Sequence, residues 1–483
     1  MILPALALAA QIALVPCAMD GVPGQARCGS HRVWENRDTK QGRQIDLSII
    51  VLSATTLDRR PDPLFALSGG PGDAPSFNAR FFSRAFSDIR KHRDLVLIDL
   101  RGTGKSAPLT CPELAKPAAT GGFDADLLSV PAVRACRARL ERSADLTRYT
   151  TEIAVDDLDE VRQALGYAQI NLYGTSYGSR VAQVYMRRHP GSLRAVAMKG
   201  IVPPSMASPE SHARAGDDAW QALVARCAAD TNCRRTFPTL DTDFHALLDR
   251  LEKTSPVLTL PAGSSRPIDS TGRLAQGRPA TSVRVTRGLF AEAFRNLLYT
   301  PENAAQAPKL VRQLLNGDNQ GIAETALAGR TVLGGDRLAA GFFLSVSCAE
   351  DVPYLPTNSR ALAAGTFGGD YRLRQQTAAC AEWPRGAVST AHRQPTRSAI
   401  PTLILSGELD PVTPPAGGDE VLHTLSRGRH VIIRNNGHPI GNAEACVGAM
   451  FAAFLEEGSA AGLDQSCAAA IPAPPFVLSG PAK

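Results

Sequence analysis

The sequence predicts an α/β protein, with a mostly parallel central sheet and a mainly helical domain inserted into it. Short apolar segments alternate with amphipathic segments up to residue 202, and the alternation returns at residue 400. Between these stretches, over 203–399, helical patterns prevail. Alternating strands and helices are typical of a parallel sheet with helices on both faces. The chain has 483 residues, 44% of them hydrophobic, which suffices for a large core and a second domain.

The first part of the core is expected over 17–202. Its strand signals are β-branched or apolar runs that end in turn residues. The run DLVLIDLRG is almost wholly apolar, as expected for a strand that is buried on both faces. The run TEIAVDDLDEVRQALGY has apolar residues near helical spacing and a glycine near its end. We expect strands at 45–54, 64–70, 94–102, 170–174 and 193–202, and helices at 151–167 and 179–191.

The inserted domain is expected to form a cap or lid over 203–399. Its sequence shows helical patterns at 211–230, 240–253, 286–299 and 304–317. The second part of the core, 400–470, should contain strands at 400–410 and 429–438 and a helix at 446–458. The proline-rich tail, 471–483, is expected to be loose.

Charge and hydropathy argue against nucleic-acid and membrane-spanning functions. The formal net charge is +6, but Lys and Arg form no long run and do not interleave with aromatic residues, so we expect no nucleic-acid partner. Residues 1–16 are apolar and resemble the apolar region of a secretory signal, although no Lys or Arg precedes Arg27. No other segment reaches 18 uninterrupted apolar residues, so we expect no stable membrane anchor.

Ten cysteines are spread along the chain. They lack the C-x-x-C and paired-histidine spacing of a zinc site, and we expect no metal and no cofactor. An even number of widely spaced cysteines fits disulfides in an oxidising compartment, which favours a secreted or periplasmic protein, whereas free thiols in a cytosolic enzyme are the alternative. The sequence leaves the connectivity open. Our hypothesis pairs sequence neighbours, as Cys17–Cys28, Cys111–Cys136, Cys227–Cys233, Cys348–Cys380 and Cys446–Cys467.

A serine between two glycines follows the strand expected at 170–174. The pentapeptide is G-T-S-Y-G, with Ser176 at its centre. One interpretation is a plain strand-to-helix turn. The other is a sharp turn that holds the serine hydroxyl above a sheet as a nucleophile. The pentapeptide by itself does not decide between them.

Two further residues complete a candidate catalytic triad with Ser176. Asp410 ends the run TLILSGELD, and His438 ends the run HVIIRNNGH. Both follow a predicted strand, at the edge where a parallel sheet presents residues to ligands. His438 would take the serine proton and return it to the leaving group, and Asp410 would orient the imidazole. Each residue alone could be an ordinary turn or loop residue, but their order along the chain is the order that such a site requires.

The glycine-rich stretch SGGPG (68–72) could supply donors to an oxyanion. It follows an apolar strand, and its glycines allow the backbone to approach a ligand closely. We expect the N–H groups of Gly70 and Tyr177 to form an oxyanion hole, with an ordinary glycine turn as the alternative. The stretch RGTGKS looks like a phosphate loop, but Asp99 stands where that motif needs glycine.

Several of these motifs occur together in one known family. SGGPG, DLRGTGKS, GTSYGSR, GELDPVTP and NNGH resemble the α/β-hydrolase serine peptidases of the tripeptidyl aminopeptidase and proline iminopeptidase group. The cysteines and the stretch VSCAEDVP are more similar to the secreted tripeptidyl aminopeptidase branch, and the resemblance runs from Cys17 to Cys467. Two positions depart from the family pattern. Ser68 stands where histidine is usual in proline iminopeptidases, and Trp34 where proline is common in this branch.

The resemblance implies a secreted enzyme that cleaves amide bonds near the free N-terminus of peptides through an acyl-enzyme. Such enzymes bind the substrate ammonium with acidic side chains of the cap, because a desolvated carboxylate anchors a cation strongly. CAEDVP offers Glu350 as the first candidate and Asp351 as the second. A solvated acidic pair at a helix end is the alternative.

Two other functions fit the same residues. A carboxylesterase or small-molecule amidase would share the triad, so the substrate could be a peptide or a small ester or amide. A non-catalytic binding protein of this fold would lack a member of the triad, and the sequence has all three.

Overall fold

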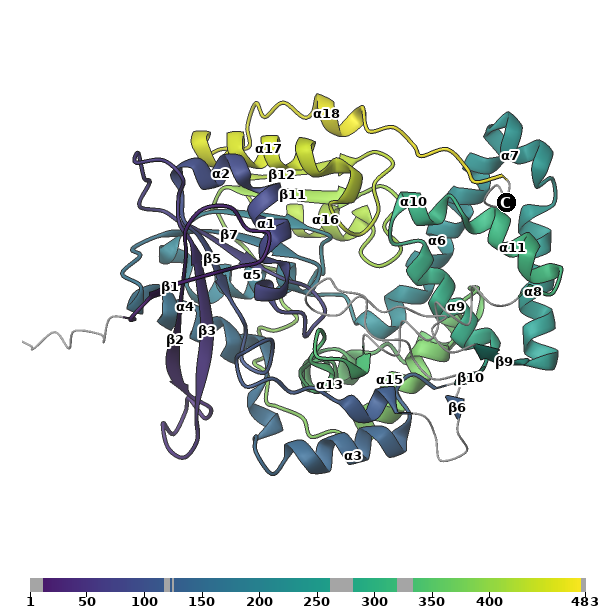
Figure 1. Cartoon of the computed structure of the whole chain (residues 1–483), viewed down its shortest axis with the longest axis horizontal. Helices are drawn as coiled ribbons and strands as arrows, with labels where there is room; N and C mark the ends of the chain where they lie inside the picture. Colours follow the sequence, from purple (N-terminus) through teal and green to yellow (C-terminus); the bar gives the residue numbers. More distant parts are fainter. Residues whose placement is uncertain (1–11, 117–121, 124–125, 261–280, 319–332, 479–483) are drawn as a thin grey trace, which may run out of the picture.

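A nine-stranded sheet forms the centre of the computed structural model, which describes residues 12–116, 122–123, 126–260, 281–318 and 333–478. The strand order is β1-β2-β3-β5-β4-β7-β8-β11-β12 (Figure 1). The strands from β5 to β12 in this order are parallel, and β1, β2 and β3 are antiparallel to their neighbours. The predicted α/β class with a mostly parallel sheet is therefore confirmed.

The parallel strands are short and almost completely buried. Their bounds are β4 (Leu64–Leu67), β5 (Leu95–Ile98), β7 (Ile170–Thr175), β8 (Leu193–Lys199), β11 (Thr402–Gly407) and β12 (Gly428–Ile433). Successive side chains of a strand point to opposite faces of the sheet. Leu64 and Ala66 accordingly belong to one apolar cluster, and Phe65 and Leu67 to another.

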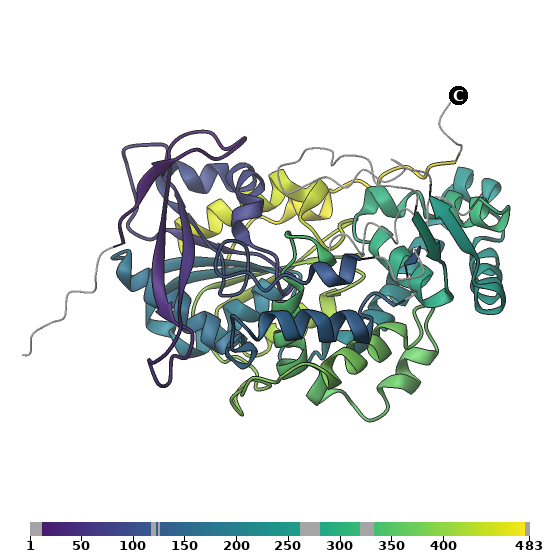
Figure 2. The same cartoon turned by 60° about the horizontal axis from the view of Figure 1, so that its bottom comes forward.

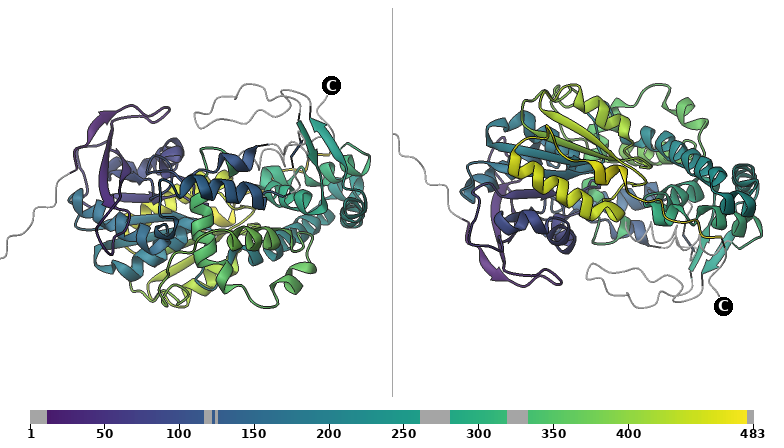
Figure 3. Two further views of the ribbon diagram at one scale, coloured as in Figure 1. Left: turned by 90° about the horizontal axis from the view of Figure 1, so that it is seen from below. Right: turned by 90° about the horizontal axis from the view of Figure 1, so that it is seen from above.

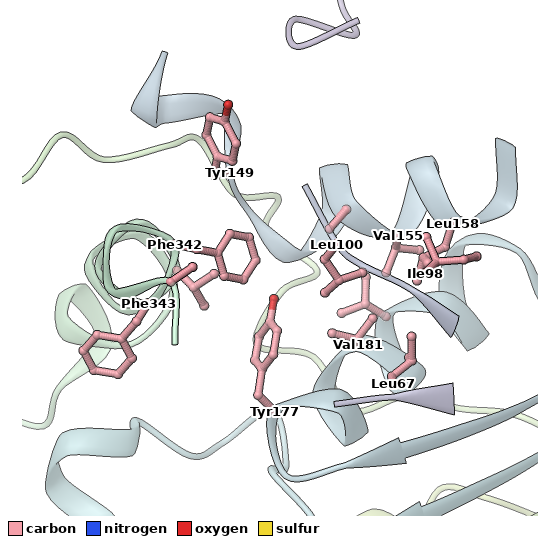
Figure 4. Packing of buried hydrophobic residues seen from close by; sticks show 14 of the residues in the cluster. Leu67, Ile98, Leu100, Tyr149, Val155, Leu158, Tyr177, Val181, Phe342 and Phe343 are labelled. Atoms are coloured by element: carbon pink, nitrogen blue, oxygen red, sulfur yellow. The ribbon is translucent and has the colours of Figure 1, made fainter. Parts of the chain in front are cut away.

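Helices cover both faces of the sheet. One cluster joins the strands to α1 (Ala79–Ala85), α2 (Ser87–His92) and α17 (Glu444–Glu457), and Figure 3 shows α17 in yellow on the face seen from above. The other cluster contains residues of α3 (Val130–Leu140), α4 (Thr151–Ala164), α5 (Tyr177–Arg188) and α16 (Pro415–Leu422). Figure 4 shows part of this second cluster, with Val155 and Leu158 of α4 beside Ile98 of β5.

An antiparallel extension at the N-terminal end of the sheet was not among the sequence expectations. It consists of β1 (Val15–Cys17), β2 (Ala26–Trp34) and β3 (Gln44–Leu52), of which only β3 was expected. Most of the expected signal segment, residues 1–11, lies outside the described residues. Val15 and Pro16, at the end of that segment, pair with β2.

The inserted region builds a second apolar core of its own. Trp220, Phe244, Phe290 and Phe294 are buried there and pack ring against ring. Figure 2 shows these helices at one end of the molecule, opposite the β2–β3 hairpin. The helices are α6 (Ser208–Ala229), α7 (Thr231–Thr236), α8 (Leu240–Thr254), α9 (Arg287–Leu297), α10 (Pro301–Ala304) and α11 (Ala307–Leu315). A three-stranded sheet of β6 (Gly122–Phe123), β10 (Thr281–Arg284) and β9 (Val257–Leu260) adjoins them.

Part of the sequence expected in the cap belongs to the main core instead. The helix α13 (Ala340–Glu350) is buried along its whole length, and its Phe342 and Leu344 join the apolar cluster beneath the sheet. The helix α15 (Tyr371–Ala381) bridges the two cores, since Tyr371 belongs to the cap cluster and Cys380 to the main one. The short helix α14 (Ser359–Ala364) lies between them in the chain.

All ten cysteines form disulfides, and the neighbour pairing is confirmed in every case. Such closed loops restrict the unfolded chain and are typical of proteins that fold in oxidising compartments. Within the described residues, no helix is long and apolar enough to cross a membrane.

The C-terminal tail is tied to the cap, although the sequence analysis expects it to be loose. After α18 (Ser466–Ala469), the carbonyl of Ile471 accepts a hydrogen bond from the Asn435 side chain of the core. Further on, the Arg226 guanidinium lies 4.1 Å from the centre of the Phe476 ring, and the Val477 N–H donates to Ala305. The described part of the tail therefore connects the core to helices α6 and α10. Residues 479–483 lie outside the described residues.

Candidate active site

Ser176 occupies a strained turn between β7 and α5. Its φ is 55°, in the left-handed region that residues with a side chain rarely adopt. The flanking glycines leave room for this turn. A Cβ at Gly174 would lie 2.2 Å from the Gly178 oxygen, and one at Gly178 would lie 2.8 Å from the Ser68 oxygen. The spacing G-x-S-x-G is thus a steric requirement here, and a plain turn without strain does not describe it.

Backbone hydrogen bonds hold the serine in place. The Ser176 N–H donates to the Lys199 carbonyl, at the end of β8, over 2.9 Å. The Ser176 carbonyl accepts from the N–H of Ser179 at 2.8 Å and from its hydroxyl at 2.6 Å. Ser176 itself lines a pocket between the sheet edge and the cap.

Asp410 and His438 form a hydrogen-bonded pair at the same sheet edge. The imidazole Nδ1 lies 2.9 Å from Oδ2 and 3.0 Å from Oδ1 of the carboxylate. Asp410 is buried and also accepts from the N–H groups of Val412 and Thr413, each at 2.9 Å. Burial alone would raise the pKa of Asp410, but His438, Lys199 and the Thr413 N–H outweigh it and lower the pKa to about 2. Because the carboxylate is ionised, the facing Nδ1 carries a proton and Nε2 is the acceptor.

Residues around the imidazole fix its orientation. The backbone N–H of His438 donates to the Tyr299 carbonyl at 2.9 Å. The rings of the two residues meet edge to face, with centroids 5.1 Å apart. The Thr413 hydroxyl lies 2.8 Å from Asp410 Oδ2 and 3.2 Å from His438 Nδ1. Tyr299 and Thr413 both border the pocket that contains Ser176.

The serine and the Asp410–His438 pair converge at the end of β8. A Cβ at Gly200 would lie 3.5 Å from His438 Cε1 and 3.6 Å from Asp410 Oδ2. Gly200 directly follows Lys199, whose carbonyl binds the Ser176 N–H. No hydrogen bond joins the Ser176 hydroxyl to His438 in the described part of the chain. Such contacts are often long before substrate binds.

The two expected oxyanion donors border this pocket as well. Gly70 (φ 107°) and Tyr177 both line it, and a Cβ at the neighbouring Gly69 would lie 3.3 Å from Ser176 Oγ. Tyr177 is the first residue of α5, where an N–H has no partner within the helix. Its ring is buried against Phe342 of α13, with centroids 6.1 Å apart (Figure 4). Gly70 and Tyr177 therefore both belong to the pocket wall that contains Ser176.

The two expected ammonium anchors have different positions. Asp351 lines the pocket, where its Oδ1 accepts from Arg180 Nη2 at 2.9 Å. Glu350 is 0% exposed and is not a pocket residue, because its two oxygens bind the N–H and hydroxyl of Thr151, each at 2.6 Å. Burial raises the pKa of Glu350 to about 7, although Arg180 and Thr151 act in the opposite direction. Of the two candidates, the structure places Asp351 in the pocket wall and buries Glu350 against Thr151.

The cap adds pocket residues that the sequence analysis missed. His212 of α6 is 8% exposed and borders the pocket, and its Nδ1 has no hydrogen-bond partner among the described residues. Burial, followed by the nearby Arg372 and Arg295, lowers the pKa of His212 well below its usual range, so the ring is neutral. Arg372 of α15 reaches the same pocket and donates to Glu292 at 2.5 Å. No local motif marks these residues, because tertiary packing alone brings them to the site.

The described residues offer one group with the spacing of metal ligands, formed by Cys111, Glu113 and Cys136. Its two sulfurs are joined in a disulfide, so they are not available as thiolate ligands.

The comparison with known protein families identifies a hydrolase. Residues 62–441 match the model of the alpha/beta hydrolase fold family, which covers well over half of the chain. The chain belongs to this family.

Its relatives include peptidases. The chain is 25% identical over 492 residues to serine protease Hip1 of Mycobacterium tuberculosis, covering 91% of this chain and 86% of that protein. It is 26% identical over 490 residues to a tripeptidyl aminopeptidase of Streptomyces coelicolor, covering 94% and 85%. Among solved structures, proline iminopeptidase of Mycobacterium smegmatis aligns at a TM-score of 0.41 with 17% identity, over 89% of this chain and 98% of that one. The similarity to serine peptidases extends over almost the whole chain.

Proposed function

We propose that the protein is a serine peptidase that cleaves amide bonds near the free N-terminus of short peptides. The observation that carries this proposal is the hydrogen-bonded pair of Asp410 and His438, which lies beside the end of β8, where the backbone of the strained Ser176 is also bound. The similarity to serine peptidases supports the peptide as the substrate class.

The proposed reaction proceeds through an acyl-enzyme. Ser176 Oγ attacks the substrate carbonyl carbon while His438 Nε2 accepts its proton, and Asp410 stabilises the imidazolium that forms. The N–H groups of Gly70 and Tyr177 stabilise the oxyanion. His438 then donates the proton to the leaving amine as the C–N bond breaks. A water molecule, deprotonated by His438, attacks the ester and releases the N-terminal product.

Asp351 is the proposed anchor for the substrate ammonium. It lies in the pocket wall, and its charge is shared with the buried Arg180. A carboxylate that is removed from water and faces a cation gives a strong, directional contact. The cap around this wall would restrict the site to peptide ends and short chains. The five disulfides support secretion or a periplasmic location.

The proposal is tested by comparing substrates with free and blocked amino ends and by identifying the fragments that are released. We expect peptidyl-nitroanilides with a free amino end to be cleaved, and the same compounds to be poor substrates after acetylation. Mass spectrometry of a longer free-ended peptide should show release of short N-terminal fragments. Equal rates on free and acetylated substrates would rule out the N-terminal specificity. Activity on p-nitrophenyl esters alone would favour a carboxylesterase, and no turnover of either class would favour a binding protein.

A further inference from the structure

A lysine is buried directly beneath the proposed triad. Lys199 is the last residue of β8 and is 0% exposed. Its Nζ donates to the carbonyl oxygens of Gly437 at 2.9 Å and His438 at 3.1 Å. No carboxylate lies within 4.0 Å of this nitrogen among the described residues. The side chain therefore ends on the backbone of the turn that carries the imidazole.

Burial of an ammonium group without a direct ion pair costs free energy, and Lys199 is buried in this way. Burial lowers the pKa of Lys199 to about 8, while the charge of Asp410 acts in the opposite direction. Asp410, on the loop after β11, and His438, after β12, are the titratable groups that face it. The neighbouring strand residues are Thr175 of β7 and Leu405 of β11, which do not titrate in this range.

The backbone of the same residue holds the serine. The Lys199 carbonyl accepts the Ser176 N–H at 2.9 Å, and the next residue, Gly200, packs closely against Thr413, Asp410 and His438. One residue thus connects the serine turn through its main chain and the histidine turn through its side chain. Its positive charge also favours the ionised form of Asp410.

We infer that Lys199 is a positioning residue for the proposed triad, which fixes the Gly437–His438 turn against the serine turn and places a positive charge near the Asp410 carboxylate. This inference rests on the proposed function. Lys199 does not border the pocket, so it acts through the triad and leaves substrate contacts unchanged.

The two contributions of Lys199 can be separated by chemistry. A neutral amine retains two N–H donors, so both bonds to the carbonyls can persist when the ammonium loses its proton, and only the charge is lost. The variant Lys199→Gln also keeps two donors without a charge, whereas Lys199→Met keeps neither. The matched control is Thr402→Val, which removes a buried hydroxyl that donates to the Ile400 carbonyl at the opposite end of β11.

The test measures phosphonylation of Ser176 by an alkyl fluorophosphonate between pH 6 and 10. This probe has no amine, so the titration of a substrate N-terminus does not enter the profile. We expect the maximal inactivation rate of Lys199→Met to fall roughly 100-fold, because a small misplacement of catalytic groups is this costly. The probe concentration that gives the half-maximal rate should stay within about twofold of the native value. The maximal inactivation rate of Lys199→Gln should fall on the order of tenfold. The native rate should decline above about pH 8, where Lys199 loses its charge, and the rate of Lys199→Gln should not. Thr402→Val should react at the native rate.

Thermal unfolding identifies any loss that comes from misfolding, and rates are normalised to the folded fraction. Native rates in Lys199→Met, or an unchanged alkaline decline in Lys199→Gln, would overturn the inference about Lys199. Labelling that persists in Ser176→Ala would instead overturn the proposed function. Loss of labelling in Ser176→Ala with native behaviour of both Lys199 variants would leave that function intact and refute the positioning role alone.

Discussion

The two walls of the pocket are built in different ways. On the sheet side, Ser176, Asp410 and His438 follow the ends of β7, β11 and β12, and backbone bonds and close glycine contacts fix their positions. On the cap side, His212 and Arg372 come from two helices, and Arg372 is held by an ion pair with Glu292, whereas the neutral His212 has no ion pair among the described residues.

This difference shows which residues of a site can be recognised from the local sequence. A turn that lacks space for a side chain demands glycine, so the constraint is visible in the sequence around Ser176. A helix tolerates many residue types on its surface. The packing of the helix against neighbouring elements determines which of its residues reach the pocket. The sheet wall should therefore carry the chemistry, and the cap wall the selection of substrates.

The largest effect is expected for Ser176→Ala, which removes the nucleophile of the sheet wall. The triad acts as a unit, so kcat should fall by roughly 10⁶-fold while KM changes little. Steady-state hydrolysis of a peptidyl-nitroanilide, together with an unchanged circular dichroism spectrum, checks this. Most of the activity remaining in the folded variant would show that another residue is the nucleophile.

Asp410→Asn should have the second largest effect. An amide stabilises the wrong histidine tautomer and does not stabilise the imidazolium, so kcat should fall by roughly 10⁴-fold. The same nitroanilide assay measures it, with the surface variant Asp419→Asn as a control, because Asp419 is exposed and bonds to a different histidine, His430. A decrease of less than tenfold in Asp410→Asn would contradict the orienting role.

Asp351→Asn tests the proposed ammonium anchor at the end of α13 and should act on binding. We expect KM for a substrate with a free amino end to rise about tenfold, which is the size of a partly compensated charge contact. The acetylated substrate should be nearly unaffected, since it has no ammonium group. The ratio of the two KM changes is the readout, and equal changes would remove Asp351 as the anchor.

Glu350→Gln should act on stability more than on substrate selection. The folded-state pKa of Glu350 is raised to about 7 by burial, so between about pH 4.5 and 7 the unfolded chain loses this proton while the folded protein keeps it. The native free energy of unfolding should therefore decline across this window by roughly 3 kcal/mol from this group, and the Gln variant should lack that decline. Urea unfolding at pH 5 and pH 8 measures the difference. Parallel pH dependence in both proteins would contradict the raised pKa.

Much of the sheet wall could be predicted from the sequence. Runs of apolar residues located the parallel strands, and chain order brought Asp410 and His438 to the end of neighbouring strands. The β1–β2 extension was missed because its strands are partly exposed and carry polar residues such as Arg27 and His31. Propensity is weak evidence for such edge strands.

The different positions of Glu350 and Asp351 could not be predicted from the sequence. Glu350 and Asp351 are adjacent, so no local pattern tells which of them faces the pocket. The turn at the end of α13 directs Glu350 towards Thr151 and Asp351 towards Arg180. Only the packing of α13 into the main core, which the sequence assigned to the cap, decides the matter.

The most direct test of the central claim is to map the covalent adduct of a fluorophosphonate by peptide mass spectrometry. We expect a single adduct on Ser176, formed quickly in the native protein and very slowly in His438→Ala. An adduct on a different serine, or equal labelling rates in the two proteins, would contradict the claim that Ser176 and His438 act together.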